Sequence, residues 1–228
     1  MSGGERQSQA VQPSLIDDPI EEARKESENA IAQIDRVLDM VDDVTRGSRP
    51  FRCRPSLMLD LHRIAMEGLS AYAGGYRPGH VEIGGSKHTP PGAHLVPSLI
   101  EEMCDYVEAN FEAREAIHLC AYVMWRLNWI HPFTDGNGRT SRAFSYYVLC
   151  CKVGYRLSGN NTVPEQIAGN KQPYYDALEA ADIQYEQGQT DLSSLEKLLD
   201  ECIAAQLLSA YDDARNPVAT RGRERKLH

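Results

Sequence analysis

Hydrophobic side chains recur every three or four positions through most of this chain, the spacing typical of amphipathic helices. The first such segment covers residues 17–44 and begins with an Asp-Asp-Pro sequence, a typical helix start. Residues 56–72 and 97–109 continue the pattern. Residues 45–55 contain one glycine, two prolines and four arginines, a composition that predicts a linker between the first two helices.

The most apolar segments lie in the middle of the chain, at residues 113–130 and 140–153. A short helix is predicted to open at Val163, another to carry residues 174–183, and a last one to cover residues 191–211. Each presents apolar side chains on one side. The sequence therefore predicts a mainly α fold, in which these helices form a bundle.

One segment departs from helical spacing. Glycine pairs at 74–75 and 84–85 flank residues 76–83, where Val81 and Ile83 alternate with polar neighbours. This pattern favours a short β-hairpin or an extended flap. A plain surface loop is the alternative for this segment.

Length and composition divide the chain into one main domain and its extensions. At 228 residues the chain can bury a core of its own. Residues 1–16 are polar and predicted to be disordered, and residues 17–50 form an N-terminal helix and linker. The domain covers residues 51–211, and residues 212–228 form a basic tail.

The charge and the cysteines exclude several classes of protein. A net charge of −9 argues against a general nucleic-acid binder. The six cysteines lack metal-site spacing and mostly occupy apolar positions, which predicts buried thiols in a reducing compartment. The polar N-terminus does not resemble a signal peptide, and no apolar run reaches membrane-spanning length. We therefore expect a cytoplasmic protein without a membrane or nucleic-acid partner.

The loop at residues 131–142, between the two most apolar helices, has the composition of a phosphate site. Gly136 and Gly138 permit a tight turn at a helix start, where free backbone N–H groups attract anions. Arg139 and Arg142 are three positions apart, hence on one helix face, and their guanidinium groups can each grip a phosphate. The loop thus predicts a site for a polyphosphate.

Two further side chains of the loop suggest a reaction. Asp135 would be repelled by phosphates unless a divalent cation bridged them, and Mg²⁺ typically binds one or two carboxylates with phosphate oxygens. His131 precedes the turn, and a histidine can serve as a general base near neutral pH. Together these groups suit the attack of a hydroxyl on a phosphorus atom, although their spacing does not select which phosphorus.

The loop also resembles a known signature. From His131 to Arg142 it is similar to the Fic-domain motif His-x-Phe-x-Asp/Glu-Gly-Asn-Gly-Arg-x-x-Arg, and every fixed position matches. The resemblance covers roughly residues 56–208 and implies a Fic-type helical bundle with a small hairpin. It further implies transfer of AMP from Mg²⁺-ATP to a Ser, Thr or Tyr hydroxyl of a target protein. A plain helix–turn–helix corner is the alternative for the loop.

The resemblance implies a role for each motif position. His131 would be the base, Phe133 the anchor of the loop in the core, and Asp135 the Mg²⁺ ligand. The remaining positions would bind the phosphates: Gly136, Asn137, Gly138, Arg139 and Arg142. A flap would hold the target segment by main-chain pairing, with its tip at Ile83, Gly84, Gly85, Ser86, Lys87 and His88. The nucleoside would contact a later helix, whose candidates are Asn170, Tyr174 and Tyr175.

Many Fic proteins carry an inhibitory helix with the pattern Ser/Thr-x-x-x-Glu-Gly/Asn, whose glutamate pairs with the second motif arginine. Glu28-Asn29 fits the end of that pattern, but Arg24 stands at its first position. Glu28 reaching Arg142 is therefore a hypothesis, and an ordinary exposed helix glutamate is its alternative. An antitoxin-like partner or a homodimer would be other routes to regulation.

Two other functions stay open for the same loop. Fic relatives also transfer UMP, phosphocholine or phosphate, and Gly138 argues against the phosphate-transferring branch, where a lysine replaces this glycine. A nucleotide-binding regulatory protein without transfer activity is the other alternative, and the intact His131 argues against it.

Overall fold

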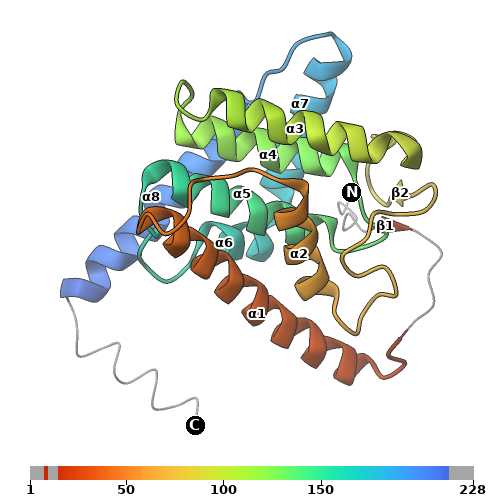
Figure 1. The fold of residues 1–228 in the computed structure, drawn as a ribbon, viewed down its shortest axis with the longest axis horizontal. Coiled ribbons are helices and arrows are strands. Elements are labelled where there is room, and N and C mark those ends of the chain that lie inside the picture. Colours follow the sequence, from red (N-terminus) through yellow and green to blue (C-terminus); the bar gives the residue numbers. More distant parts are fainter. Residues whose placement is uncertain (1–7, 10–14, 216–228) are drawn as a thin grey trace.

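The computed structural model describes residues 8–9 and 15–215, and within these the chain is mainly helical (Figure 1). The prediction of a mainly α fold is confirmed. The helices are α1 Pro19–Thr45, α2 Pro55–Met66, α3 Val96–Asn110, α4 Ala116–Ile130, α5 Asn137–Val153, α6 Val163–Gly169, α7 Gln172–Glu186 and α8 Ser193–Arg215. A short 3-10 helix, Ala93–Leu95, leads into α3.

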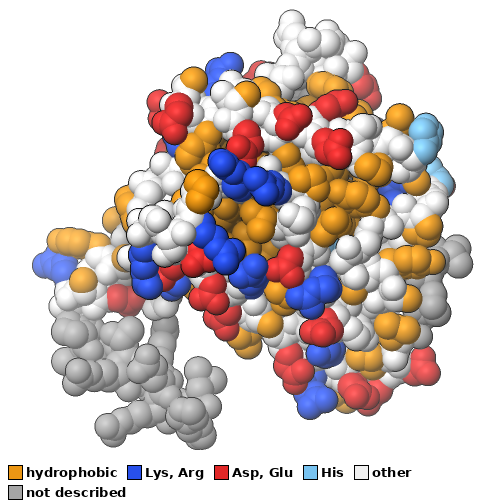
Figure 2. Space-filling model, in the orientation of Figure 1, with side chains coloured by type: hydrophobic (Ala, Val, Ile, Leu, Met, Phe, Trp, Pro, Cys, Tyr) orange, Lys and Arg blue, Asp and Glu red, His pale blue; other side chains and the backbone are white. Residues whose placement is uncertain are grey.

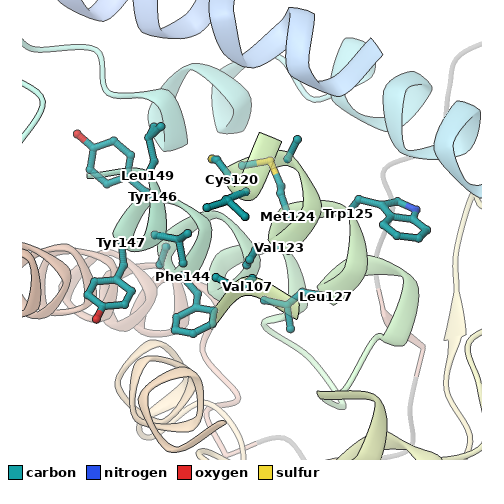
Figure 3. Packing of buried hydrophobic residues seen from close by; sticks show 14 of the residues in the cluster. Val107, Cys120, Val123, Met124, Trp125, Leu127, Phe144, Tyr146, Tyr147 and Leu149 are labelled. Carbon is teal, nitrogen blue, oxygen red and sulfur yellow. The ribbon is translucent and has the colours of Figure 1, made fainter. Parts of the chain in front are cut away.

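Helices α4 and α5 form the centre of the molecule and pack against each other over their length (Figure 1). Their buried side chains surround much of each helix rather than one stripe, because other helices cover both. Figure 3 shows Cys120, Val123, Met124 and Leu127 of α4 on the side of Phe144, Tyr146, Tyr147 and Leu149 of α5. The segment between α4 and α5 is therefore held at both ends by the core.

Helix α1 starts as its sequence predicts. Asp18 caps it by accepting a hydrogen bond from the Ile20 N–H at 2.9 Å, and Pro19 occupies the first turn. Its C-terminal half buries Val37 and Val41 against α2 and α5. The N-terminal half is more exposed and runs past the end of α5 that carries the loop.

The extended segment predicted near residues 76–83 is present, but it is not a local hairpin. Strand β2 is Glu82–Ile83, and it pairs antiparallel with β1, Ser8–Gln9, so that Ser8 lies opposite Ile83 (Figure 1). The residues before β2 bend instead of pairing, because Pro78 lacks an N–H donor and Arg77 is tied to other segments. The prediction of a hairpin was wrong in its partner strand.

The predicted disorder of residues 1–16 is also incorrect for Ser8 and Gln9, which form β1. Residues 1–7 and 10–14 lie outside the described residues, as does most of the predicted basic tail, residues 216–228. The disorder prediction relied on composition, which does not register a pairing across a long sequence separation.

The prediction that the thiols are buried is confirmed. All six cysteines are free and buried. Acidic and basic side chains lie next to one another over the face seen in Figure 2. None of the helices in the described ranges combines the length and apolar character needed to cross a membrane.

Candidate active site

A cavity of about 870 Å³ opens where α4 ends and α5 begins. Its walls come from the loop between these helices, the N-terminal half of α1, the flap around β2, and α7. The cavity brings together the predicted motif residues His131, Asp135, Gly136, Asn137, Gly138, Arg139 and Arg142. Segments far apart in the sequence therefore meet at the loop.

The turn into α5 needs glycine at its cap. Gly136 has φ +74°, a conformation that other residues rarely adopt, and a Cβ there would lie 2.7 Å from the sulfur of Met66. Helix α5 starts at the next residue, so the first N–H groups of the helix face the cavity without intrahelical partners. This end of α5 is suited to bind an anion.

Asn137 holds the shape of the loop with its side chain. Its Oδ1 accepts from the Phe133 N–H at 3.0 Å, and its Nδ2 donates to the Phe133 carbonyl at 2.9 Å. The side chain is only 4% exposed. Asn137 thus contributes a backbone N–H to the helix start and a rigid brace to the residues before it.

Phe133 is fully buried, as the resemblance implies for an anchor, and its ring stacks on His62 with centroids 3.6 Å apart. His62 Nδ1 accepts from the Gly74 N–H, so its Nε2–H donates to the Asp135 carbonyl at 3.1 Å. Burial lowers the pKa of His62 to about 4. His62 is therefore a neutral prop under the loop, not a second base.

His131 caps the C-terminus of α4, directly after Ile130, and is held in a left-handed backbone conformation, with φ 51° and ψ 60°. Its ring nitrogens are directed by two neighbours. Nδ1 lies 3.4 Å from the Asn128 carbonyl, and Nε2 lies 2.8 Å from the hydroxyl of Ser8. A carbonyl beside Nδ1 favours the proton on that nitrogen, which leaves Nε2 to accept a proton. This is the arrangement that a general base requires.

Arg77 links the flap to the loop through its hydrogen bonds, a role that its position before the predicted flap does not by itself specify. The residue is 3% exposed, and its guanidinium donates to the carbonyls of His131 at 2.7 Å, Gly79 at 2.7 Å, and Pro91. The backbone N–H of Arg77 donates to the Pro132 carbonyl at 2.8 Å. Burial lowers the pKa of Arg77 from its ordinary value. An arginine in a Gly- and Pro-rich segment looks exposed from sequence, because its acceptors are distant in the chain.

The two motif arginines differ in their surroundings. Arg139 pairs with two carboxylates at 3.0 Å each, those of Asp135 and Glu26. Arg142 is half-buried in the cavity wall. Burial lowers the pKa of its guanidinium, and the nearby Tyr174 and Tyr175 act in the opposite direction and raise it. Both arginines line the same cavity, on one side of α5. The predicted placement of two cations beside the helix start is present.

Asp135 offers a single carboxylate at the cavity. Its Oδ1 accepts from the Gly136 N–H at 2.6 Å, and 44% of its side chain is exposed. In residues 8–9 and 15–215, no group of three or more histidine, cysteine, aspartate or glutamate side chains is placed so that it could hold a metal ion. A single carboxylate fits Mg²⁺ that binds it together with phosphate oxygens.

Glu28 does not reach Arg142 in this structure. Its side chain is about half exposed and lies 3.9 Å from Arg24, one turn earlier on α1. Glu26, two positions before it, faces the cavity and pairs with Arg139 instead. Asn29 is buried and donates to the carbonyls of Ala65 and Glu67, which sets the rotation of α1 and turns Glu28 outward.

Only part of the predicted flap tip reaches the cavity. Ile83 and His88 line it, and His88 Nε2 lies 2.7 Å from the Trp129 carbonyl. Lys87 points away and pairs with Glu179 at 3.2 Å. The tip residues Gly84, Gly85 and Ser86 do not line the cavity.

Two of the three candidates for contact with the nucleoside line the cavity. Tyr174 and Tyr175 line the cavity, with Tyr174 buried in the core and Tyr175 half-buried. Asn170 is exposed at the end of α6 and does not line it, whereas the next residue, Lys171, does.

Comparisons with known proteins show the family of the central part of the chain and its fold. Residues 52–149 match the model of the Fic/DOC family. A relative named protein adenylyltransferase Fic, from Drosophila willistoni, is 33% identical over 100 residues, which cover 43% of this chain and 20% of the relative. The chain thus spans about one fifth of the length of that curated relative.

Solved structures share the fold at low sequence identity. The Fic-1 structure from C. elegans has a TM-score of 0.65 and 18% identity, with 84% of this chain and 53% of that chain covered. A Fic domain signaling protein from Bacteroides thetaiotaomicron has a TM-score of 0.64 and 18% identity, with 89% and 73% covered. The Bartonella tribocorum effector BepC, solved with bound AMPPNP, has a TM-score of 0.54 and 12% identity, with 82% and 88% covered.

Proposed function

We propose that this chain, whose residues 52–149 form a Fic/DOC family domain, is a protein adenylyltransferase. It would transfer AMP from Mg²⁺-ATP to a Ser, Thr or Tyr hydroxyl of a target protein and release pyrophosphate. The observation that carries the proposal is the position of His131 Nε2. It lies 2.8 Å from the hydroxyl oxygen of Ser8, beside the start of α5, which suits phosphates. The names of the curated relatives support the adenylyl group as the one transferred.

Phosphate binding follows from the start of α5. The N–H groups of Gly138 and its neighbours can hydrogen-bond the phosphate nearest the base, while Arg139 and Arg142 bind the outer phosphates. A Cβ on Gly138 would lie 3.1 Å from the Arg142 guanidinium. A side chain at this position would therefore crowd the guanidinium of an arginine that the outer phosphates need.

The chemical step needs one proton transfer and one displacement. The hydroxyl gives its proton to His131 Nε2 as its oxygen bonds to the α-phosphorus, and the bond to the pyrophosphate oxygen breaks. The Asn128 carbonyl near Nδ1 stabilises the imidazolium that forms. Negative charge on the α-phosphate oxygens falls in front of the α5 N–H groups, where a helix dipole stabilises it.

The remaining contacts concern Mg²⁺, the nucleoside and the target. Asp135 would hold Mg²⁺, which neutralises phosphate charge when bound. Tyr175 is the better placed of the two tyrosines for an adenine contact, because Tyr174 is enclosed in the core. The target segment would pair with β2 as an added strand, which brings its hydroxyl to His131 whatever its neighbouring side chains are.

The label that reaches protein separates this activity from its alternatives. Purified protein and a cell lysate are incubated with Mg²⁺-ATP labelled at either the α- or the γ-phosphate, with His131→Ala as the control. Adenylyl transfer predicts α-label on protein with wild type above the His131→Ala control, and γ-label equal to that control, which kinases of the lysate supply. A γ-label above the control would contradict adenylyl transfer in favour of phosphate transfer. ATP binding without any transfer would favour the regulatory protein.

A further inference from the structure

The strand that pairs with the flap belongs to this chain, and it carries a hydroxyl to the base. Strand β1 adds to β2 antiparallel, with Ser8 opposite Ile83, which itself lines the cavity. Figure 1 shows the two strands side by side. Adding a strand to an open edge is a general way to hold an extended peptide. Ser8 therefore occupies the place that an incoming hydroxyl side chain would need.

Two side chains orient the Ser8 hydroxyl. Asn137 Nδ2 lies 3.1 Å from Ser8 Oγ and can only donate, so the serine oxygen accepts this bond. The same oxygen lies 2.8 Å from His131 Nε2. With the proton of the imidazole on Nδ1 beside the Asn128 carbonyl, the Ser8 O–H donates to Nε2.

The cavity beyond this hydroxyl is the one that the phosphates would fill. Ser8 lines it together with the start of α5 and both motif arginines. The serine oxygen uses one lone pair for Asn137 and keeps the other for a new bond. These contacts describe a nucleophile held against its base, next to the site of its electrophile.

We infer that Ser8 is an acceptor of the adenylyl group, so that the enzyme modifies its own N-terminal segment within one molecule. The inference rests on the proposed function. The Ser8 Oγ–H proton moves to His131 Nε2, the Oγ–P bond forms at the α-phosphorus, and the bond from that phosphorus to pyrophosphate breaks. The products are O-adenylylated Ser8 and pyrophosphate, so no further reactant is needed.

Self-modification and transfer to other proteins use the same edge and the same base. The β1 segment and an external target would both pair with β2, and only one hydroxyl can lie at Nε2. Removing the Ser8 hydroxyl therefore abolishes self-modification at this position.

The test incubates the full chain with Mg²⁺-ATP and maps the adenylyl group by tandem mass spectrometry. The group is expected on Ser8, is lost in Ser8→Ala, and persists in Ser2→Ala, the matched control in the same N-terminal segment. The half-time of Ser8 modification should not change when the protein is diluted, since the reaction is intramolecular. A half-time that lengthens in proportion to dilution would overturn the intramolecular step.

Two further arms separate this inference from the proposed function. In the first arm, wild type is incubated with a lysate and α-labelled ATP. Labelled lysate proteins together with an unmodified Ser8 would overturn self-modification, while the proposed function would stand. In the second arm, the same incubation is repeated with Glu26→Gln, in which Arg139 loses a competing carboxylate. If neither this variant nor wild type labels any protein, the self-modification and the proposed function are both overturned. His131→Ala mixed with Ser8→Ala should stay unlabelled, and label on its Ser8 would show transfer between copies instead.

Discussion

The carboxylate of Glu26 accepts a hydrogen bond from the guanidinium of Arg139 at 3.0 Å. Arg139 also pairs with Asp135, so the first motif arginine is engaged by two acids before any phosphate arrives. Glu26 belongs to α1, which lies outside residues 52–149 of the family match. The N-terminal helix thus competes with the nucleotide for an arginine of the phosphate site.

Replacing Glu26 by glutamine should strengthen binding of Mg²⁺-ATP, because the guanidinium loses a competing carboxylate. Half of the Glu26 side chain is exposed, and such ion pairs contribute at most about 1 kcal/mol, so the dissociation constant should fall by up to about fivefold. Isothermal titration calorimetry measures it. Glu28→Gln is the matched control, since Glu28 pairs only at the surface with Arg24. An equal effect of both variants would contradict a specific role for Glu26.

Gly136 should be much less tolerant of alanine than Gly47. Both have φ +74°, but a Cβ at Gly47 meets nothing within 4 Å, whereas at Gly136 it would lie 2.7 Å from the Met66 sulfur. Gly47→Ala should lower the free energy of unfolding by about 1 to 2 kcal/mol from backbone strain alone. Gly136→Ala should lose more, and urea denaturation compares them. Equal losses would mean that Met66 moves aside freely.

Arg77 should be needed for both stability and activity. Arg77→Met leaves the carbonyls of His131, Gly79 and Pro91 without their donor, and bonds from a charged donor contribute about 1.5 to 3 kcal/mol each. We expect a loss of at least about 2 kcal/mol in the free energy of unfolding and slower transfer at unchanged ATP affinity. Arg63→Met is the control, because Arg63 forms only an exposed pair with Asp60. If both variants lost the same stability, Arg77 would be an ordinary surface arginine.

His62 should make the protein less stable as the pH falls below 6.5. Burial holds its pKa at about 4 in the folded protein, so between the ordinary value of 6.5 and 4 the unfolded chain binds the extra proton. Stability from this group is present above pH 6.5 and is lost progressively down to about pH 4, by roughly 3 kcal/mol in total. Denaturant titrations at several pH values measure the slope. His62→Asn should flatten it, and an unchanged slope in this variant would assign the effect to other groups.

Much of the fold could be predicted because the helices follow local rules. The three-to-four spacing located the helices, and Asp18-Pro19 marked the start of α1 where the structure has it. The loop between α4 and α5 could also be predicted, since Gly136 and its neighbours carry the chemistry within a short stretch. Because these residues are adjacent in sequence, they lie together at the N-terminus of α5.

The contacts that complete the site were hidden because they join distant segments. Ser8 lies in a polar terminus and reaches His131 only through pairing with β2. Arg77 is buried by backbone carbonyls, which any residue type supplies, so no side-chain pattern signals it. Glu26 rather than Glu28 faces the cavity because the rotation of α1 depends on where Asn29 docks. Helical spacing predicts which residues share a face, but not which neighbour that face meets.

The central claim is that two parts of one loop have separate roles. The start of α5 binds the triphosphate, and His131 accepts the proton of a hydroxyl. The most direct test measures the dissociation constant for Mg²⁺-ATP and the rate of adenylyl transfer in the same two variants, His131→Ala and Arg142→Ala. We predict that His131→Ala loses transfer and keeps the affinity of wild type, whereas Arg142→Ala loses affinity. Transfer that survives in His131→Ala, or ATP binding that is unchanged in Arg142→Ala, would contradict the account.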